Sequence, residues 1–182
     1  SIRRQRQMCI RDSSYTERDD VGITGARLLY EDNTVQHAGV VIGYNGLAGH
    51  TFVGNEPDDV GYRAYVIQAR DYSAVTAACL MVKASLYDEV GGFEEELEVA
   101  FNDVDFCLKV REKGYLVVYN PYAVLHHYES KSRGYEDTPE KRNRFEKEAF
   151  FTYNKWEKIL ADGDPCYNPN LTLSNSDFSL RE

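Results

Sequence analysis

Features that would mark several protein classes are missing from this sequence of 182 residues. No apolar run approaches the roughly 20 residues that a membrane-spanning helix needs, and no charged-then-apolar leader opens the sequence. The four cysteines show no CxxC spacing, so neither structural zinc nor a disulfide framework is indicated. A net charge of -9, with basic residues interleaved among acidic ones, argues against a nucleic-acid partner. We therefore expect a soluble, intracellular protein.

The chain divides into three unequal parts. Residues 5–13, QRQMCIRDS, resemble the translation of a transposase-type sequencing adapter, so we expect residues 1–14 to be a non-native or disordered leader. A basic, flexible arm is the alternative. Residues 15–163 are long enough for one domain with its own core. Residues 164–182, rich in Asn, Pro, Ser and Asp, have little regular pattern and are expected to form an extended tail.

In the first half of the domain, apolar runs alternate with turn residues. Val21 to Tyr30 and Val35 to Gly43 favour neighbouring strands or a hairpin. Glycines and scattered aromatic residues from Tyr44 to Tyr72 indicate a long irregular loop, and such loops inside a domain are usually functional. Ser73 to Val82 suits a buried strand, and Ala84 to Val90 suits a short helix that ends at a Gly-Gly pair.

In the second half, helical and strand patterns also alternate. Asn102 to Gly114 suits a helix that Asn102 caps, with acidic residues in its first turn and basic residues in its last. Tyr115 to Tyr119 and Tyr122 to Tyr128 suit two strands. Thr138 to Leu160 suits a helix with a Thr cap and Pro at its first position. Strands alternating with helices indicate an α/β sandwich, and such sheets bind ligands at the carboxyl ends of their strands.

Two carboxylates at the start of the expected helix are candidate site residues. A carboxylate in a partly dry pocket can act as a general base at neutral pH, and Asp103 is the candidate. Ordinary helix capping is the structural alternative for the same residue. Asp105 lies about 200° further round the helix, so both carboxylates cannot point into one site if the helix is regular. We expect one of them to act and the other to orient.

Two consecutive histidines fall on a predicted strand. His126 and His127 should face opposite sides of the sheet, so at most one of them is a ligand. Imidazole and carboxylate together suit Mn or Mg when phosphate oxygens complete the coordination shell. A hydrogen-bonded packing role is the alternative. His37 and His50 receive no role.

Two further groups have both functional and structural interpretations. Lys131 and Arg133, in a Gly-containing loop after the histidines, can neutralise a departing diphosphate, or belong to a solvated basic loop. Aromatic side chains of the Tyr44 to Tyr72 loop can stack on a sugar face, or fill a small core of their own.

Several strings, in order, carry a resemblance to a known family. They are Gly25–Tyr30 (GARLLY), Gln36–Val40 (QHAGV), Thr76–Leu80 (TAACL), Gly91–Glu95 (GGFEE), Asn102–Leu108 (NDVDFCL) and Leu125–Ser130 (LHHYES). Residues 21–182 resemble the C-terminal portion of family 2 glycosyltransferases with the GT-A fold, notably the bacterial rhamnosyltransferase-like branch. The implied fold is a mixed sheet flanked by helices.

The resemblance implies an inverting enzyme that transfers a sugar from a nucleotide-sugar donor to a glycan acceptor in cell-surface polysaccharide synthesis. Asp103 would be the general base. His126 would bind a divalent cation, Mn or Mg, in the complete enzyme. The implied substrate-binding residues are Gly92, Phe93, Asn102, Asp105 and Arg133. The implied location is the cytoplasm, or the inner face of the membrane as a peripheral protein.

The sequence departs from the family pattern in two places. The motif often begins with Glu-Asp, where this chain has Asn102-Asp103, so the base has a different neighbour. The nucleotide-binding strands and the Asp-x-Asp metal motif expected upstream are absent, and Asp19-Asp20 precedes a strand instead of ending one. We therefore expect an incomplete GT-A domain that lacks its nucleotide-binding half and is inactive when made alone.

Two other functions remain open on the sequence. A noncatalytic carbohydrate-binding or scaffold domain would keep the acceptor cleft without turnover. A metal-dependent hydrolase built on Asp103, Asp105 and His126 lacks the dense His and Asp spacing that such sites show.

Overall fold

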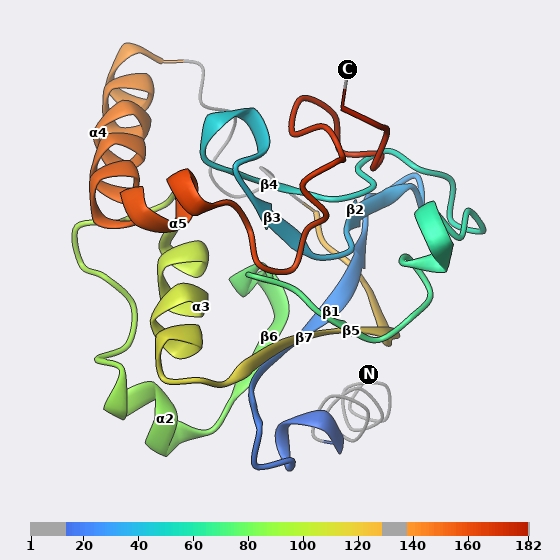
Figure 1. The fold of residues 1–182 in the computed structure, drawn as a ribbon, viewed down its shortest axis with the longest axis horizontal. Coiled ribbons are helices and arrows are strands. Elements are labelled where there is room, and N and C mark those ends of the chain that lie inside the picture. Colours follow the sequence, from blue (N-terminus) through green and yellow to red (C-terminus); the bar gives the residue numbers. More distant parts are fainter. Residues whose placement is uncertain (1–13, 129–137, 182) are drawn as a thin grey trace.

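Strand β1 (Val21–Leu29), in which all nine residues are buried, lies at the centre of the computed structural model of this protein (Figure 1). The structure describes residues 14–128 and 138–181. The later elements are β2 (Val35–His37), β3 (Val40–Ile42), η1 (Tyr44–Gly46), β4 (Ala48–His50), η2 (Tyr62–Ala64), β5 (Arg70–Asp71), η3 (Ala77–Cys79), β6 (Leu80–Val82), α2 (Ala84–Glu89), α3 (Asn102–Glu112), β7 (Leu116–His126), α4 (Pro139–Lys155) and α5 (Glu157–Asp162). Within these described ranges, no helix has the length and apolar character needed to cross a membrane.

β1 belongs to a five-stranded mixed sheet with the order β2-β1-β7-β5. It pairs in parallel with β7, from Val21 opposite Leu116 to Leu29 opposite His126. Its other edge pairs antiparallel with β6 near its start and with β2 at its end. The expected α/β class with a mixed sheet is confirmed. The run from Val35 to Gly43, however, divides between two sheets, because β3 pairs with β4 in a separate hairpin.

Three predicted elements have different bounds in the structure. The expected strand from Ser73 to Val82 is strand only in β6, because the Thr76 side chain accepts a hydrogen bond from the Ala78 amide and starts the 3-10 turn η3. The two strands expected between residues 115 and 128 are one long strand, β7, whose register shifts beside Ala26 and Arg27. The last predicted helix breaks at Trp156 into α4 and α5.

The buried side of α3 packs into the main hydrophobic core, which also includes side chains of the sheet, the β3–β4 hairpin and the C-terminal segment. The helix buries Val104, Phe106, Cys107, Leu108 and Val110. The extended segment before η3 crosses β1 closely at Gly25, where a Cβ atom would lie 2.5 Å from the Val75 side chain. Only glycine leaves room for this crossing, so β1 and the segment that leads into η3 stay in direct contact.

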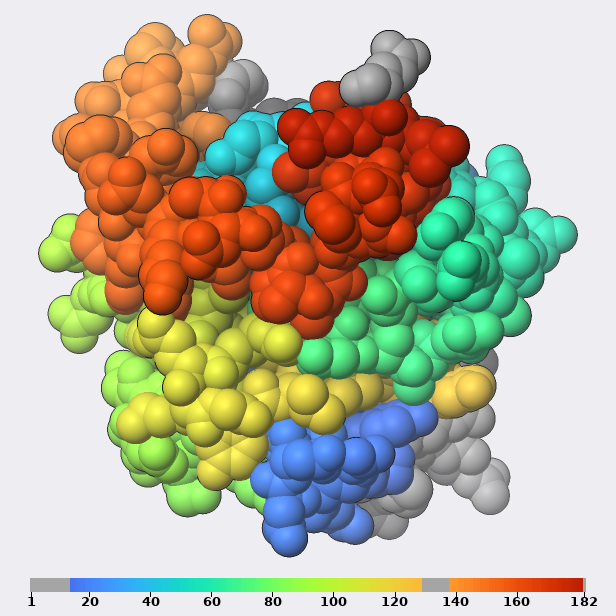
Figure 2. Space-filling view, in the orientation of Figure 1, coloured from blue at the N-terminus to red at the C-terminus, as the bar shows by residue number. Residues whose placement is uncertain are grey.

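The segment from Tyr44 to Tyr72, expected to be one irregular loop, contains β4, β5 and two 3-10 turns, and it packs with the C-terminal segment around aromatic rings. Phe178 stacks on Phe52, with 4.7 Å between ring centroids, and on Tyr62 at 5.5 Å. The Arg70 guanidinium lies 3.5 Å from the centroid of the Tyr65 ring. Figure 2 shows the C-terminal segment lying against the loop that carries these rings. These rings join the same hydrophobic core as β1, α3 and β7, so they pack in the interior but do not form a small core of their own.

Asp164 connects this C-terminal segment to the rest of the fold. Its buried carboxylate accepts hydrogen bonds from the Ile42 amide at 2.7 Å, the Ser73 hydroxyl at 2.6 Å and the Cys166 amide at 2.7 Å. Burial raises the pKa of the Asp164 carboxyl above its usual range, and these three hydrogen bonds offset that effect in part. The carboxylate thus links the β3–β4 hairpin, the chain before η3 and the end of α5.

We expect Asp164→Asn to lower the free energy of unfolding by about 2 kcal/mol, because an NH2 group cannot accept the hydrogen bonds that the carboxylate accepts. Urea denaturation measures the change. The matched control is Asp162→Asn, an exposed residue at the end of α5. Equal stability of the two variants would contradict the structural role of Asp164.

His37 is a fully buried histidine in β2. Its Nε2 atom accepts a long hydrogen bond of 3.5 Å from the Thr76 amide, and its ring meets that of His50 edge-on at 4.7 Å. Burial, together with His50, lowers the pKa of His37 well below its ordinary value. The native state therefore keeps this imidazole neutral, whereas the unfolded chain binds a proton below about pH 6.5.

Stability should consequently fall as the pH drops through the unfolded-state pKa of His37. Between pH 7.5 and pH 5.5 we expect a loss of about 1.4 kcal/mol from this residue alone. Urea denaturation of the wild type and of His37→Gln at both pH values isolates the contribution. The same pH dependence in both proteins would rule it out.

Candidate functional site

The first turn of α3 and the end of β7 are where most of the expected site residues lie. α3 precedes β7 directly and packs against both β7 and β1 (Figure 1). Because the connection between helix and strand is short, the two run antiparallel, and the first turn of α3 lies toward the carboxyl ends of β1 and β7. Sheets of this class bind ligands at that edge.

Asp103 lies half-buried in the first turn of α3. Its Oδ2 atom accepts a hydrogen bond from the Ala77 amide at 3.1 Å, and its Oδ1 atom accepts one from the Val104 amide at 2.9 Å. A carboxylate has about four acceptor positions, so each oxygen can accept another hydrogen bond. The side chain thus ties η3 to α3 and still has capacity for a substrate hydroxyl. Its role as general base stays a prediction.

The start of α3 differs from the expected cap. The cap position is Phe101, whose φ of 60° is left-handed, and Asn102 is the first residue of the helix. No side chain of the cap residue bonds to the first turn. The amides of Glu98, Val99 and Ala100, which precede the cap residue, donate to the Glu148 carboxylate of α4. The expected cap by Asn102 is therefore wrong, and a long-range contact holds the loop just before the helix.

Asp105 is fully buried on the inner side of α3. Its Oδ1 atom accepts a hydrogen bond from Trp156 Nε1 at 2.9 Å and lies 2.8 Å from Lys155 Nζ. Its Oδ2 atom lies 3.4 Å from Lys109 Nζ. The helical spacing correctly predicts that the two carboxylates point apart. A direct substrate contact of Asp105 stays a prediction, and its partners in this structure are all protein side chains.

Gly92 and Phe93 lie beside α3. The Gly92 carbonyl accepts a hydrogen bond of 2.6 Å from Lys109 Nζ, and this glycine has a left-handed φ of 65°. The Phe93 ring packs on Phe106 at 4.8 Å between centroids and remains 38% exposed. The structure thus places this turn against the middle of α3, with the Phe93 side chain partly exposed.

The histidines gather around β2. His126 is exposed at the end of β7 and its Nε2 atom lies 2.8 Å from Asn33 Oδ1. His127 Nδ1 lies 2.9 Å from Gln36 Oε1, and His50 Nδ1 lies 3.1 Å from the Gln36 carbonyl. In residues 14–128 and 138–181, no group of three His, Cys, Asp or Glu side chains could hold a metal ion. The cation-binding role of His126 stays a prediction.

Lys131 and Arg133 lie outside the described residues.

The sequence analysis missed one residue of the site region, Glu148 of α4, whose carboxylate binds the loop just before α3. The sequence did contain a signal for it, because Glu148 is a charged residue on the same helix face as Thr152 and Trp156. A charge in an apolar stripe is expected to have a buried partner.

No protein-family model matches the chain. The chain is 51% identical over 165 residues to an uncharacterized protein of Sinorhizobium fredii. The aligned part is 90% of this chain and 18% of that protein. It is 36% identical over 172 residues to the O-antigen biosynthesis protein RfbC of Myxococcus xanthus, covering 92% of this chain and 13% of that protein.

A shorter similarity, 35% identity over 60 residues, relates 33% of the chain to 20% of the N-acetylglucosaminyl-diphospho-decaprenol L-rhamnosyltransferase of Mycobacterium tuberculosis. The chain thus spans less than a fifth of the two relatives that it matches over most of its length. The similarity to proteins named for O-antigen synthesis and for rhamnosyl transfer supports a relationship with the glycosyltransferases.

Proposed function

We propose that this chain forms the acceptor side of a glycosyltransferase of family 2, with a GT-A fold, that acts in cell-surface polysaccharide synthesis. The similarity to the O-antigen biosynthesis protein over 92% of the chain carries the proposal. The position of Asp103, half-buried toward the carboxyl ends of β1 and β7, supports it. Because the chain covers a small part of its relatives, the proposed activity is that of a full-length protein of their kind rather than of these 182 residues alone.

In the proposed reaction, Asp103 takes the proton of an acceptor hydroxyl. The hydroxyl oxygen forms a bond to the anomeric carbon of a nucleotide-activated sugar while the bond from that carbon to the diphosphate breaks. Attack opposite the leaving group inverts the configuration at that carbon. The hydrogen bonds from Ala77 and Val104 orient the carboxylate, and they leave acceptor capacity on each oxygen for the incoming proton.

A divalent cation, Mn or Mg, would neutralise charge on the diphosphate when bound. His126 is exposed and would offer one imidazole ligand, but the described residues hold no set of three ligands. Residues 14–128 and 138–181 therefore do not form a complete cation site by themselves. Arg133 is proposed as a further contact to the donor phosphates.

Phe93 and Asn102 are proposed to line the acceptor, next to Gly92. Phe93 presents part of an aromatic ring to solvent beside α3, and aromatic rings stack well on sugar faces. A cytoplasmic location, or one at the inner membrane face, follows as part of the same proposal because nucleotide sugars are the proposed donors.

A chimaera tests the function without knowledge of the donor sugar. This chain replaces the matching segment of the Myxococcus O-antigen biosynthesis protein, in a strain that lacks the native protein. We expect the wild-type chimaera to restore O-antigen and Asp103→Asn to lower its synthesis about 100-fold or more, because the amide cannot act as a base. Immunoblots of lipopolysaccharide measure the product.

Asp88→Asn, an exposed change on α2, is the matched control and should leave O-antigen synthesis unchanged. Equal protein levels of the variants exclude a folding defect. Full synthesis by the Asp103→Asn chimaera would refute the base role and favour a carbohydrate-binding or scaffold domain. Sugar transfer by the purified 182-residue chain alone would show that the chain is more than the acceptor side of the enzyme, and would refute that part of the proposal.

A further inference from the structure

One carboxylate of α4 holds the loop that leads into α3. Glu148 Oε1 accepts hydrogen bonds from the amides of Glu98 at 3.1 Å and Val99 at 3.2 Å, and its Oε2 atom accepts one from the Ala100 amide at 2.7 Å. Glu148 is 2% exposed. Hydrogen bonds to a charged acceptor are stronger than those between neutral groups. Three consecutive amides are thus bound to one side chain that lies about 50 residues later in the chain.

The position of this loop determines where Asp103 lies. Ala100 is followed by Phe101, which turns the chain with its left-handed conformation, and then by the first turn of α3. Phe101 also packs against Phe145 of α4, with 5.5 Å between ring centroids. A shift of the loop relative to α4 would therefore move the Asp103 backbone.

Lys155 makes a second set of contacts, which join the residues before the loop to the first turn of α3. Lys155 Nζ, at the end of α4, lies 2.8 Å from Glu94 Oε2 and 2.8 Å from Asp105 Oδ1. Glu94 directly follows the turn formed by Gly92 and Phe93, and Asp105 lies two residues after Asp103. A single ammonium group therefore joins the turn to the start of α3.

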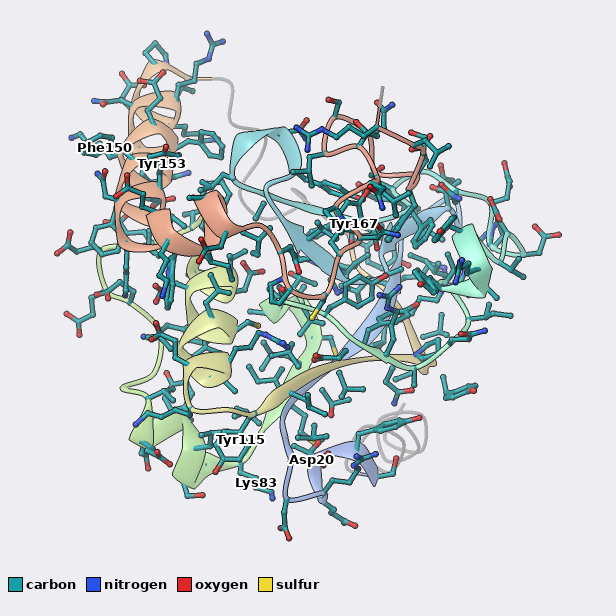
Figure 3. The ribbon with its side chains drawn as sticks, in the orientation of Figure 1. Asp20, Lys83, Tyr115, Phe150, Tyr153 and Tyr167 are labelled. Atoms are coloured by element: carbon teal, nitrogen blue, oxygen red, sulfur yellow. The ribbon has the colours of Figure 1, made fainter. Side chains whose placement is uncertain are left out.

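These contacts use only the inner face of α4. Phe150 is 70% exposed and Tyr153 is 47% exposed, and Figure 3 shows Phe150 on the outer side of the helix. The inner face instead buries Glu148 and Thr152. Charged and hydrogen-bonded groups, which are directional, thus join α4 to the segment 94–105, and directional contacts set orientation more closely than apolar packing does.

We propose that α4 is the positioning element of the site, with Glu148 and Lys155 as positioning residues that hold Asp103 against η3. The described contacts of both residues are to groups of the protein itself. The catalytic consequence rests on the proposed function, whereas the effect on the Asp103 side chain is a property of this chain alone. The Ala77 amide, which donates to Asp103 Oδ2, reports that effect from outside α4 and its loop.

The test uses the full chain, labelled with 15N, and the variant Glu148→Gln. The substitution keeps the shape of the side chain but turns an NH2 group toward amide donors. We expect the amides of Glu98 to Ala100 to exchange with solvent about tenfold faster or more. We also expect the Ala77 amide signal to shift in the direction that Asp103→Asn produces.

Glu146→Gln is the matched control, because this exposed residue on the same helix loses the same charge and should change neither readout. Lys155→Met, with Lys147→Met as its control, tests the second set of contacts and should shift the Ala77 signal as well. An unchanged Ala77 signal in both Glu148→Gln and Lys155→Met would overturn the proposal, even if the loop amides exchange faster.

None of these measurements requires sugar transfer, so the two proposals fail separately. If the O-antigen chimaera is insensitive to Asp103→Asn while Ala77 responds to Glu148→Gln, the function is wrong and the positioning role stands. If the chimaera needs Asp103 while Ala77 does not respond, the function stands and α4 is only a structural support.

Discussion

The parallel pairing of β1 with β7 is the constraint on which the arrangement of the molecule depends. It runs from Val21 opposite Leu116 to Leu29 opposite His126. A parallel pair requires a crossover, and here the crossover contains α3, which returns antiparallel to β7. The start of the helix and the end of the strand therefore lie toward the same edge of the sheet, at the carboxyl ends of β1 and β7.

Buried charge, rather than apolar surface alone, then joins the outer layers to this frame. Asp105 meets Lys155 and Trp156 inside the protein, and Glu148 meets three backbone amides. A buried carboxylate is costly unless partners surround it, so each of these groups accepts only a narrow range of arrangements. The C-terminal segment follows the same rule, because Asp164 bonds to the hairpin and to Ser73. Charges of this kind favour one relative placement of segments that apolar packing alone would leave variable.

Much of the fold can be predicted from local signals. The Thr138 cap with Pro139 marks the start of α4, and the hydrophobic pattern with terminal charges marks α3. Other bounds depend on tertiary contacts: β6 is short because the chain before it crosses β1 at Gly25 and then turns at Thr76. For the site, the opposite directions of Asp103 and Asp105 follow from helical geometry. The Glu148 contact does not, because no local pattern tells which loop a buried carboxylate will meet.

The sequence by itself determined the α/β class, the helix that carries Asp103 and the separation of the two carboxylates, because these follow from periodicity and spacing within a few residues. Only the tertiary structure decided that Asp105 is buried, that Glu148 binds the amides just before α3, and that aromatic rings of residues 44–72 pack with Phe178. These outcomes depend on which distant groups satisfy each charge, amide and ring, and that choice is made by the packing of the whole chain.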